Sequence, residues 1–149
     1  MKVYRSMVIP FPIDEVWASV RAFDGVSTWN PAVAAATMES GTATTVGAVR
    51  RLEIVDGGVF RETLLAHSDL ERFYSYDILE SPLPVTDYRS THRFIEITAG
   101  KQTLSIWEGR FDCAPAEAED LAKLVGDEIY LNGMEGLSHY LAESSGKRS

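Results

Sequence analysis

The sequence predicts an α+β domain in which one antiparallel sheet packs against a long C-terminal helix. Residues 33–111 read as six strands separated by Gly, Pro, Ser and Asp breakers, and residues 3–9 read as a seventh strand before them. After Pro115 the pattern becomes helical: acidic residues open a helix whose apolar positions continue to Leu141, a length of roughly 40 Å at 1.5 Å per residue. An amphipathic helix of that length can cover one face of the sheet.

The segment between the first strand and the other six predicts two short helices. A proline and two acids at residues 12–15 open the first, because proline suits the first helical turn and acids are favoured at the positive end of the helix dipole. Its inward positions are Val16, Trp17 and Val20. A second helical turn at residues 27–29 ends before Pro31, since the residue before a proline disfavours helical geometry.

Length and composition predict one globular domain over residues 1–149, with an ordered core at about residues 2–142 and a polar tail, 144–149, that frays. The chain is 45% hydrophobic and 24% charged, as in ordinary globular proteins. Its net charge of −8 argues against nucleic acid as a partner, because phosphate contacts need a basic face. We expect a monomer, or a weak homodimer through an exposed strand edge.

The location expected from the sequence is the cytoplasm. No apolar run approaches the roughly 20 residues of a membrane span. The N-terminus lacks the apolar core of a signal peptide, and the single cysteine, Cys113, rules out an intrachain disulfide.

Glu62 occupies the apolar face of a predicted strand, in phase with Phe60, because strand side chains alternate between faces. A carboxylate in apolar surroundings either takes up a proton through a raised pKa or finds a cation. A three-residue hairpin loop at residues 56–58 places Leu52 opposite Glu62 and Arg50 diagonal to it, within reach of a guanidinium. The pattern predicts an inward Arg50–Glu62 ion pair.

The other hairpins direct aromatic side chains to the same face. The predicted registers are Tyr76 opposite Glu62, through a loop at residues 68–70, and Phe94 opposite Trp107, through a turn at residues 100–101. Tyr88 also faces inward. These aromatic residues serve either as core or as the wall of a ligand site, and a buried tyrosine hydroxyl needs a partner in both cases.

Asn132 is the second polar residue that the pattern turns inward. One stripe of the C-terminal helix carries, at helical spacing, Leu121, Val125, Ile129, Asn132, Gly136 and Tyr140. Glycines in this helix, each costing up to about 1 kcal/mol relative to alanine, indicate close approach or empty space beneath it. Asn132 is either a satisfied helix amide or part of a pocket between helix and sheet, and inward polar groups favour the pocket.

Several motifs carry a family resemblance through their order and spacing. They are Glu15-Val16-Trp17 with Arg21-Ala22-Phe23-Asp24, then Val46-Gly47-Ala48-Val49-Arg50, Arg61-Glu62-Thr63-Leu64, Asp87-Tyr88-Arg89-Ser90 and Leu131-Asn132. From about Arg5 to Leu141 the chain resembles the START-like (SRPBCC), helix-grip superfamily, especially its polyketide cyclase/dehydrase-type members, and more distantly the plant abscisic-acid receptors.

The resemblance implies a helix-grip fold: a seven-stranded curved antiparallel sheet wrapped around the C-terminal helix, with an apolar cavity between them. It implies that Glu62, Tyr88 and Asn132 line that cavity. In relatives with enzymatic activity, an inward arginine and glutamate, here Arg50 and Glu62, are thought to transfer protons.

The departures from the receptors are equally informative. The lysine that holds the hormone carboxylate falls at Ala34, and the receptor gate is replaced by the shorter segment at residues 56–58. Hormone sensing is therefore not expected. A proline-stiffened loop at residues 81–85 stands instead at the expected cavity mouth.

No metal and no cofactor are expected. His67, His92 and His139 lack metal-ligand spacing, Cys113 stands without a neighbouring base, and no glycine-rich phosphate loop is present. His92 shares the inward face of Tyr88, where a histidine can carry protons.

Two functions follow. The first is binding of a small hydrophobic or amphipathic ligand, with the ligand-binding residues Glu62, Tyr76, Tyr88, Trp107, Asn132 and Phe60. The alternative is a polyketide cyclase/dehydrase-like lyase or cyclase in which Glu62 moves a proton and Arg50 steadies oxyanion charge. A purely structural Arg50–Glu62 pair also remains open. A protein that docks on membranes lacks support, because no basic or exposed apolar segment is evident.

Overall fold

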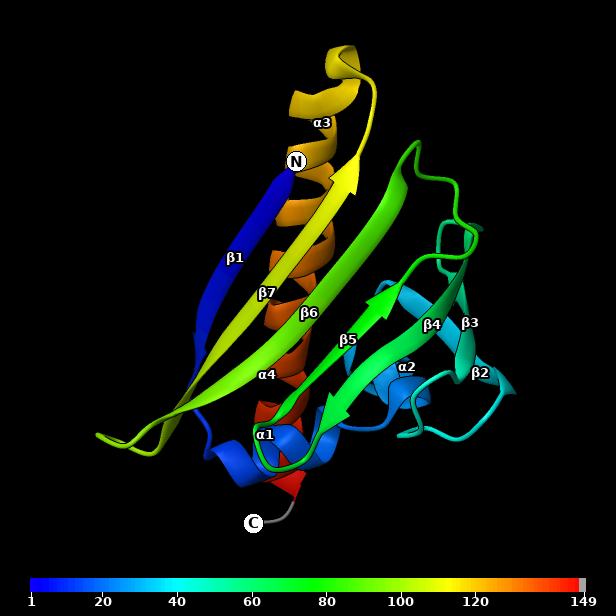
Figure 1. Ribbon diagram of the computed structural model, residues 1–149. Coiled ribbons are helices and arrows are strands. Elements are labelled where there is room, and N and C mark those ends of the chain that lie inside the picture. Colours follow the sequence, from blue (N-terminus) through cyan, green and yellow to red (C-terminus); the bar gives the residue numbers. More distant parts are fainter. Residues whose placement is uncertain (148–149) are drawn as a thin grey trace.

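The computed structural model describes residues 1–147, and it has the α+β helix-grip architecture that the sequence predicts. The strands are β1 (Lys2–Ile9), β2 (Val33–Ser40), β3 (Val49–Ile54), β4 (Val59–Ser68), β5 (Phe73–Asp77), β6 (Thr86–Ile97) and β7 (Gln102–Asp112). They form one seven-stranded sheet in the order β1-β7-β6-β5-β4-β3-β2, and each neighbouring pair is antiparallel. Figure 1 shows this sheet curving around the long C-terminal helix.

The short helices lie where the sequence places them. Helix α1 (Ile13–Val20) follows Pro12 and buries Val16, Trp17 and Val20. A 3₁₀ turn, η1 (Phe23–Gly25), leads into α2 (Val26–Trp29), which ends two residues before Pro31. Figure 1 shows α1 at the base of the molecule, and α2 behind the β3–β4 side of the sheet.

The observed register of the β3–β4 hairpin is offset by two residues from the predicted one. Arg50 pairs with Glu62, and Leu52 with Phe60, so that arginine and glutamate are directly opposite rather than diagonal. The loop is 55–57, because Gly57 adopts φ +101, the left-handed geometry that closes such a loop and that glycine takes at little cost. The faces stay as predicted, since the offset is two residues in total.

The other two hairpins have four-residue loops, which also corrects their registers. At residues 69–72, the Ser68 hydroxyl accepts the Glu71 N–H at 3.0 Å and supports the longer loop. This loop and a register shift between Leu64 and Ala66 together pair Tyr76 with Leu64 rather than Glu62. At residues 98–101, the loop includes Gly100 and Lys101 and begins two residues before them, so Trp107 pairs with His92 rather than Phe94.

The C-terminal helix changes its winding midway. A 3₁₀ turn, η2 (Pro115–Glu117), precedes α3 (Ala118–Lys123), the π-helix η3 (Leu124–Leu131) and α4 (Asn132–Lys147). Residues 148–149, the end of the predicted polar tail, lie outside the described residues. No helix within residues 1–147 is long and apolar enough to cross a membrane.

The π-helix overturns the predicted inward position of Asn132. A π-helix holds more residues per turn than an α-helix, so every later side chain is displaced around the axis. The buried stripe keeps Leu121 and Val125 and then falls one residue later than predicted, at Tyr130, Gly133, Leu137 and Leu141. Asn132 is consequently exposed.

Candidate ligand cavity

A cavity of about 270 Å³ lies between η3, α2 and strands β2 to β7. Its exposed lining residues mark where it opens: Ala32 before β2, Asp56 of the β3–β4 loop, Pro82 of the loop at residues 81–85, and Glu128 of η3. The deep end is lined by the buried side chains of Arg50, Glu62, Tyr76, Tyr88 and Trp107. The proline loop therefore stands at the mouth, as predicted.

The structure brings together six of the seven residues that the sequence places at the site. Arg50, Phe60, Glu62, Tyr76, Tyr88 and Trp107 all line the cavity. Asn132 does not, because of the π-helix. The amide that lines the cavity is Asn30, which is 8% exposed and accepts the backbone N–H of Ala32 at 3.1 Å.

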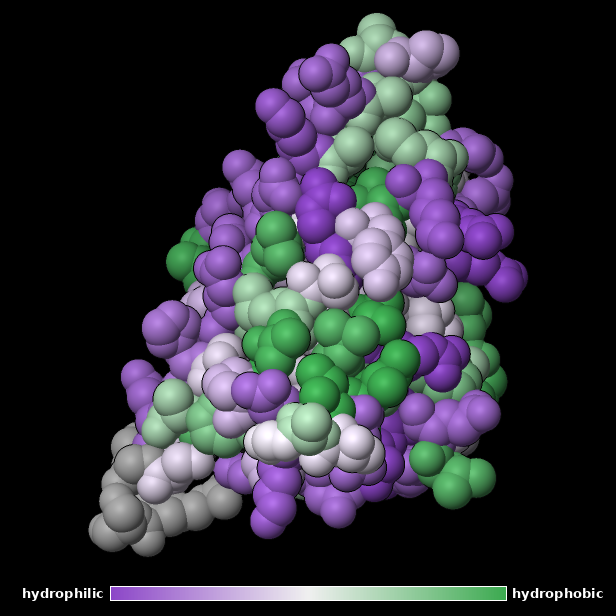
Figure 2. Space-filling view, turned by 90° about the vertical axis from the view of Figure 1, so that its left-hand side faces the viewer, coloured by the Kyte–Doolittle hydropathy of each residue, from purple (hydrophilic) through white to green (hydrophobic). Residues whose placement is uncertain are grey.

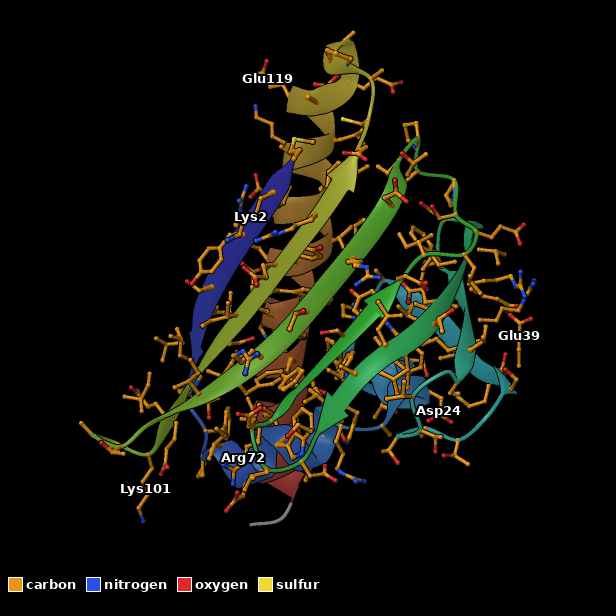
Figure 3. The ribbon with its side chains drawn as sticks, viewed as in Figure 1. Lys2, Asp24, Glu39, Arg72, Lys101 and Glu119 are labelled. Carbon is orange, nitrogen blue, oxygen red and sulfur yellow. The ribbon has the colours of Figure 1, made fainter. Side chains whose placement is uncertain are left out.

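Arg50 and Glu62 form a buried ion pair at the deep end. Their exposed fractions are 3% and 4%, whereas the charged side chains labelled in Figure 3 project from the periphery of the fold. Glu62 Oε1 lies 2.9 Å from Arg50 Nε and 2.8 Å from Arg50 Nη2. Arg50 Nη1 donates to the carbonyl of Phe23 at 2.6 Å, and the guanidinium lies 3.9 Å above the Phe23 ring. Within residues 1–147, Glu62 Oε2 receives no hydrogen bond.

Burial and pairing act in opposite directions on the pKa of Glu62. Burial raises the pKa of this carboxyl above its ordinary value, and the charge and hydrogen bond of Arg50 offset only part of that rise. For Arg50, burial lowers the pKa, but the attraction of Glu62 and of Tyr74 and Tyr76 outweighs it, so the guanidinium pKa is raised. The cavity therefore holds a fixed cation beside a carboxyl of increased proton affinity.

A hydroxyl network forms the wall next to the ion pair. Trp107 Nε1 donates to Tyr76 Oη at 3.1 Å and to Ser90 Oγ at 2.9 Å. Tyr130 Oη hydrogen-bonds to Ser90 Oγ at 3.0 Å and to Tyr88 Oη. Burial raises the pKa of Tyr130 to about 12 and that of Tyr76 and Tyr88 well above 10, so these groups are neutral donors and acceptors.

Sequence reasoning did not find Tyr130, although one signal pointed to it. Gly109 occupies an inward position on β7 between Trp107 and Phe111, and a glycine inside a strand often marks a close approach. A Cβ on Gly109 would lie 2.1 Å from Tyr130 Oη. The missing side chain at residue 109 makes room for the tyrosine of the facing helix.

His92 faces inward, as predicted, but it lies behind the cavity wall. Its ring stacks on Trp107 with centroids 4.2 Å apart, and Nε2 is 2.8 Å from Ser105 Oγ. Burial lowers the His92 pKa to about 3, so the imidazole is neutral at physiological pH. Its position favours a packing role over the carriage of protons.

The fold and the site together define a helix-grip protein with a pocket lined by residues of the curved sheet and the C-terminal helix. The chain belongs to the SRPBCC-type family described as "Polyketide cyclase / dehydrase and lipid transport", which matches residues 1–142. The expected superfamily is thereby confirmed. A comparison with curated proteins found no match.

Solved structures of similar proteins have the same fold. The protein XoxI from Bacillus cereus is 28% identical, with a TM-score of 0.86 and 97% of each chain covered. A putative uncharacterised protein from Bacillus thuringiensis is 30% identical, with a TM-score of 0.86, over 95% of this chain and 99% of that one. A protein from Nitrosospira multiformis is 27% identical, with a TM-score of 0.82, over 97% and 99%.

Proposed function

We propose that the chain binds a small hydrophobic or amphipathic ligand in this cavity. The observation that carries the proposal is a cavity with apolar walls whose deep end presents the carboxyl group of Glu62, one oxygen of which, Oε1, is held by Arg50. Ligand sites commonly combine apolar walls with a few such polar groups. At about 270 Å³ the cavity suits a small ligand.

The walls and the deep end have different roles in this proposal. Leu52, Ile54 and Phe60 cover the apolar part of the ligand, at roughly 25 cal/mol for each Å² removed from water. Glu62 Oε2 accepts a hydrogen bond from a hydroxyl or amide group of the ligand, and Tyr88 orients that group. A ligand group that donates to the Glu62 carboxyl gains a hydrogen bond at the deep end.

Native mass spectrometry of gently purified protein, together with binding of the uncharged dye Nile red, tests the proposal. We expect a co-purified small molecule, and a rise in dye fluorescence that Ile54→Trp abolishes, because the indole fills the cavity. Ile95→Trp, on the exposed outer face of β6, is the matched control and should bind like the native chain. If the dye binds equally to all three proteins, it does not occupy the cavity.

A second candidate function is proton transfer on a polyketide-like or carbonyl substrate. It is favoured by the raised pKa of Glu62, which brings a buried carboxyl closer to the range where it can both take and give a proton. Glu62 would remove a proton from a carbon next to the carbonyl, and Arg50 beside it would stabilise the resulting negative charge.

Turnover of a β-dicarbonyl substrate tests this second candidate. Glu62→Gln should abolish turnover, whereas Glu53→Gln, at an exposed position of β3, should leave it unchanged. Circular dichroism must show the native fold in both variants. Activity that survives Glu62→Gln rules out the proton-transfer role.

The proposal includes the setting of the protein. We infer a cytoplasmic monomer or weak homodimer with no nucleic-acid partner, which the charge of −8 and the single cysteine support. Sedimentation at several protein concentrations tests the oligomeric state.

A further inference from the structure

We infer that the cavity selects cationic amphiphiles, such as long-chain amines, over fatty acids of the same length, with the ammonium group at the mouth. This inference rests on the proposed ligand-binding function and adds the charge of the ligand. It is carried by the ionisable side chains that line the cavity. Apart from the neutral tyrosines Tyr76 and Tyr88, they are Arg50, Asp56, Glu62 and Glu128, three acids and one base.

The one base, Arg50, is already paired with a carboxylate of the protein. Each of the three guanidinium nitrogens of Arg50 already contacts an oxygen: Nε and Nη2 contact Glu62 Oε1, and Nη1 donates to the Phe23 carbonyl. The guanidinium carbon also lies over the Phe23 ring, 3.9 Å from its centroid. A ligand carboxylate beside Arg50 would either displace Glu62 from its partner or lie next to a second buried carboxylate, and both outcomes are unfavourable.

The mouth carries uncompensated negative charge. Asp56 and Glu128 come from different elements, the β3–β4 loop and η3, and both are exposed. Within residues 1–147 neither forms an ion pair, although Asp56 Oδ1 accepts the Gly58 N–H at 2.9 Å. Both charges act on whatever group emerges from the cavity, since both line its exposed end.

The geometry also fixes the orientation of the ligand. An ammonium group at the deep end would lose its hydration, and the adjacent Arg50 cation would offset the attraction of Glu62. The deep end therefore suits an uncharged donor, the hydroxyl or amide group proposed above as the partner of Glu62. At the mouth the same group keeps its water and faces two acids. The apolar chain then lies against Leu52, Ile54 and Phe60, which line the cavity between its two ends.

The test compares decylamine, decanol and decanoate by calorimetric titration, each below its micelle concentration. At an ionic strength of about 0.01 M, where charges act over about 30 Å, we expect decylamine to bind about tenfold more tightly than decanoate, with decanol between them. At about 1 M the preference should largely disappear, because charges then act over only about 3 Å.

Two double variants with equal net charge assign the effect to the mouth. Asp56→Asn/Glu128→Gln should remove most of the preference for decylamine and leave the affinity for decanol unchanged. Glu71→Gln/Glu96→Gln changes two exposed acids outside the cavity lining and should keep the preference.

The outcomes separate the two proposals. If decanoate binds as tightly as decylamine, or if both double variants lose the preference equally, the charge inference is wrong while the ligand cavity stands. If none of the three probes and no Nile red binds, the proposed function itself fails, and this inference fails with it.

Discussion

Arg50 and Glu62 show how a single buried contact constrains the residues around it. The pair is almost fully buried, and an unpaired charge at that depth is far more costly than no charge. We expect Glu62→Gln to lower the free energy of unfolding by about 3–5 kcal/mol, because it leaves the Arg50 cation without its partner. Arg50→Met/Glu62→Leu should cost less than Glu62→Gln, since both charges are removed together.

Urea denaturation at neutral pH measures these differences. A cost of less than about 1 kcal/mol for Glu62→Gln would contradict the prediction. It would mean that Glu62 is already protonated in the folded protein, because glutamine closely mimics the neutral acid.

Gly109 and Tyr130 form the second constraint at the scale of single residues. A methyl group on Gly109 would overlap Tyr130 Oη at 2.1 Å and approach Cζ at 3.3 Å. We expect Gly109→Ala to destabilise the protein by about 1–3 kcal/mol. Tyr130→Phe removes the overlapping atom and loses its hydrogen bonds, a cost of about 1 kcal/mol.

A double-mutant cycle measured by thermal unfolding tests this contact. Gly109→Ala should cost little more in the Tyr130→Phe background, because the overlapping hydroxyl is gone. Gly25→Ala is the control, since a Cβ there meets only Ala22 Cβ at 3.5 Å. Equal costs of Gly109→Ala in both backgrounds would show that the hydroxyl is not what the alanine displaces.

The inward face of each strand could be predicted from the sequence for a simple geometric reason, but the exact pairing between strands could not. The inward faces of Arg50, Glu62 and Tyr76 follow from the alternation of side chains, which does not depend on the neighbouring strand. The partner of each residue depends on loop length, and each hairpin turned out to be closed by a loop placed or sized differently from the expected one. At Arg50, Tyr76 and Trp107 the offset is two residues, which leaves the face unchanged; for Tyr76 this requires the register shift between Leu64 and Ala66.

The C-terminal helix illustrates the opposite case. Helical periodicity predicts which face of a helix is buried only while the winding stays regular. The apolar pattern of the sequence did not indicate the π-helix at Leu124–Leu131. The extra residue in the π-helix is therefore why the sequence predicted an inward Asn132 and missed the inward Tyr130. The error is confined to the positions after Val125, which is what a local change of winding produces.

Deletion of a single residue tests whether the π-helix contains one residue more than an α-helix would need over the same length. Without the exposed Glu128, the interval from Val125 to Tyr130 shortens to the four residues of an α-helical turn. We expect this variant to keep its fold, with a helical circular dichroism spectrum and a stability within about 2 kcal/mol of the native chain.

The matched control is deletion of Glu135, an exposed residue in the regular helix α4. That deletion rotates all later positions by about 100° and turns Leu137 and Leu141 out of the core, so we expect unfolding. Equal tolerance of both deletions would contradict a special role for the π-helix.

The whole molecule consists of two regions with different packing. Figure 1 shows β1, β7 and β6 lying along the C-terminal helix, whereas β2, β3 and β4 diverge from it and leave α2 beneath them. Stacked rings join the first region: His92, Trp107 and Tyr130 have centroid distances of 4.2 and 4.8 Å and come from β6, β7 and η3. The second region holds most of the cavity.

Figure 2 turns the β1 side to the viewer, and hydrophobic residues gather there among hydrophilic ones; Tyr4 and Val8 of β1 are each 47% exposed. This edge strand is the surface on which the expected weak homodimer is to be tested.

The buried His92 makes global stability sensitive to mild acid. Its pKa is about 3 in the folded protein because burial disfavours the imidazolium, whereas a histidine in an unfolded chain titrates near 6.5. Between those values the unfolded chain binds a proton that the folded chain does not, so the stability contributed by neutral His92 is present above about pH 6.5 and is lost as the pH falls toward 3. The free energy of unfolding changes by at most about 1.4 kcal/mol per pH unit, or about 2 kcal/mol between pH 6.5 and pH 5.

His92→Phe keeps an aromatic ring against Trp107 and removes the titrating group. Over that pH interval, the free energy of unfolding of the variant should therefore fall by about 2 kcal/mol less than that of the native chain. Urea denaturation at the two pH values measures the difference, with the exposed His139→Phe as the control. If His92→Phe loses as much stability in acid as the native chain, the acid sensitivity arises outside the stacked core.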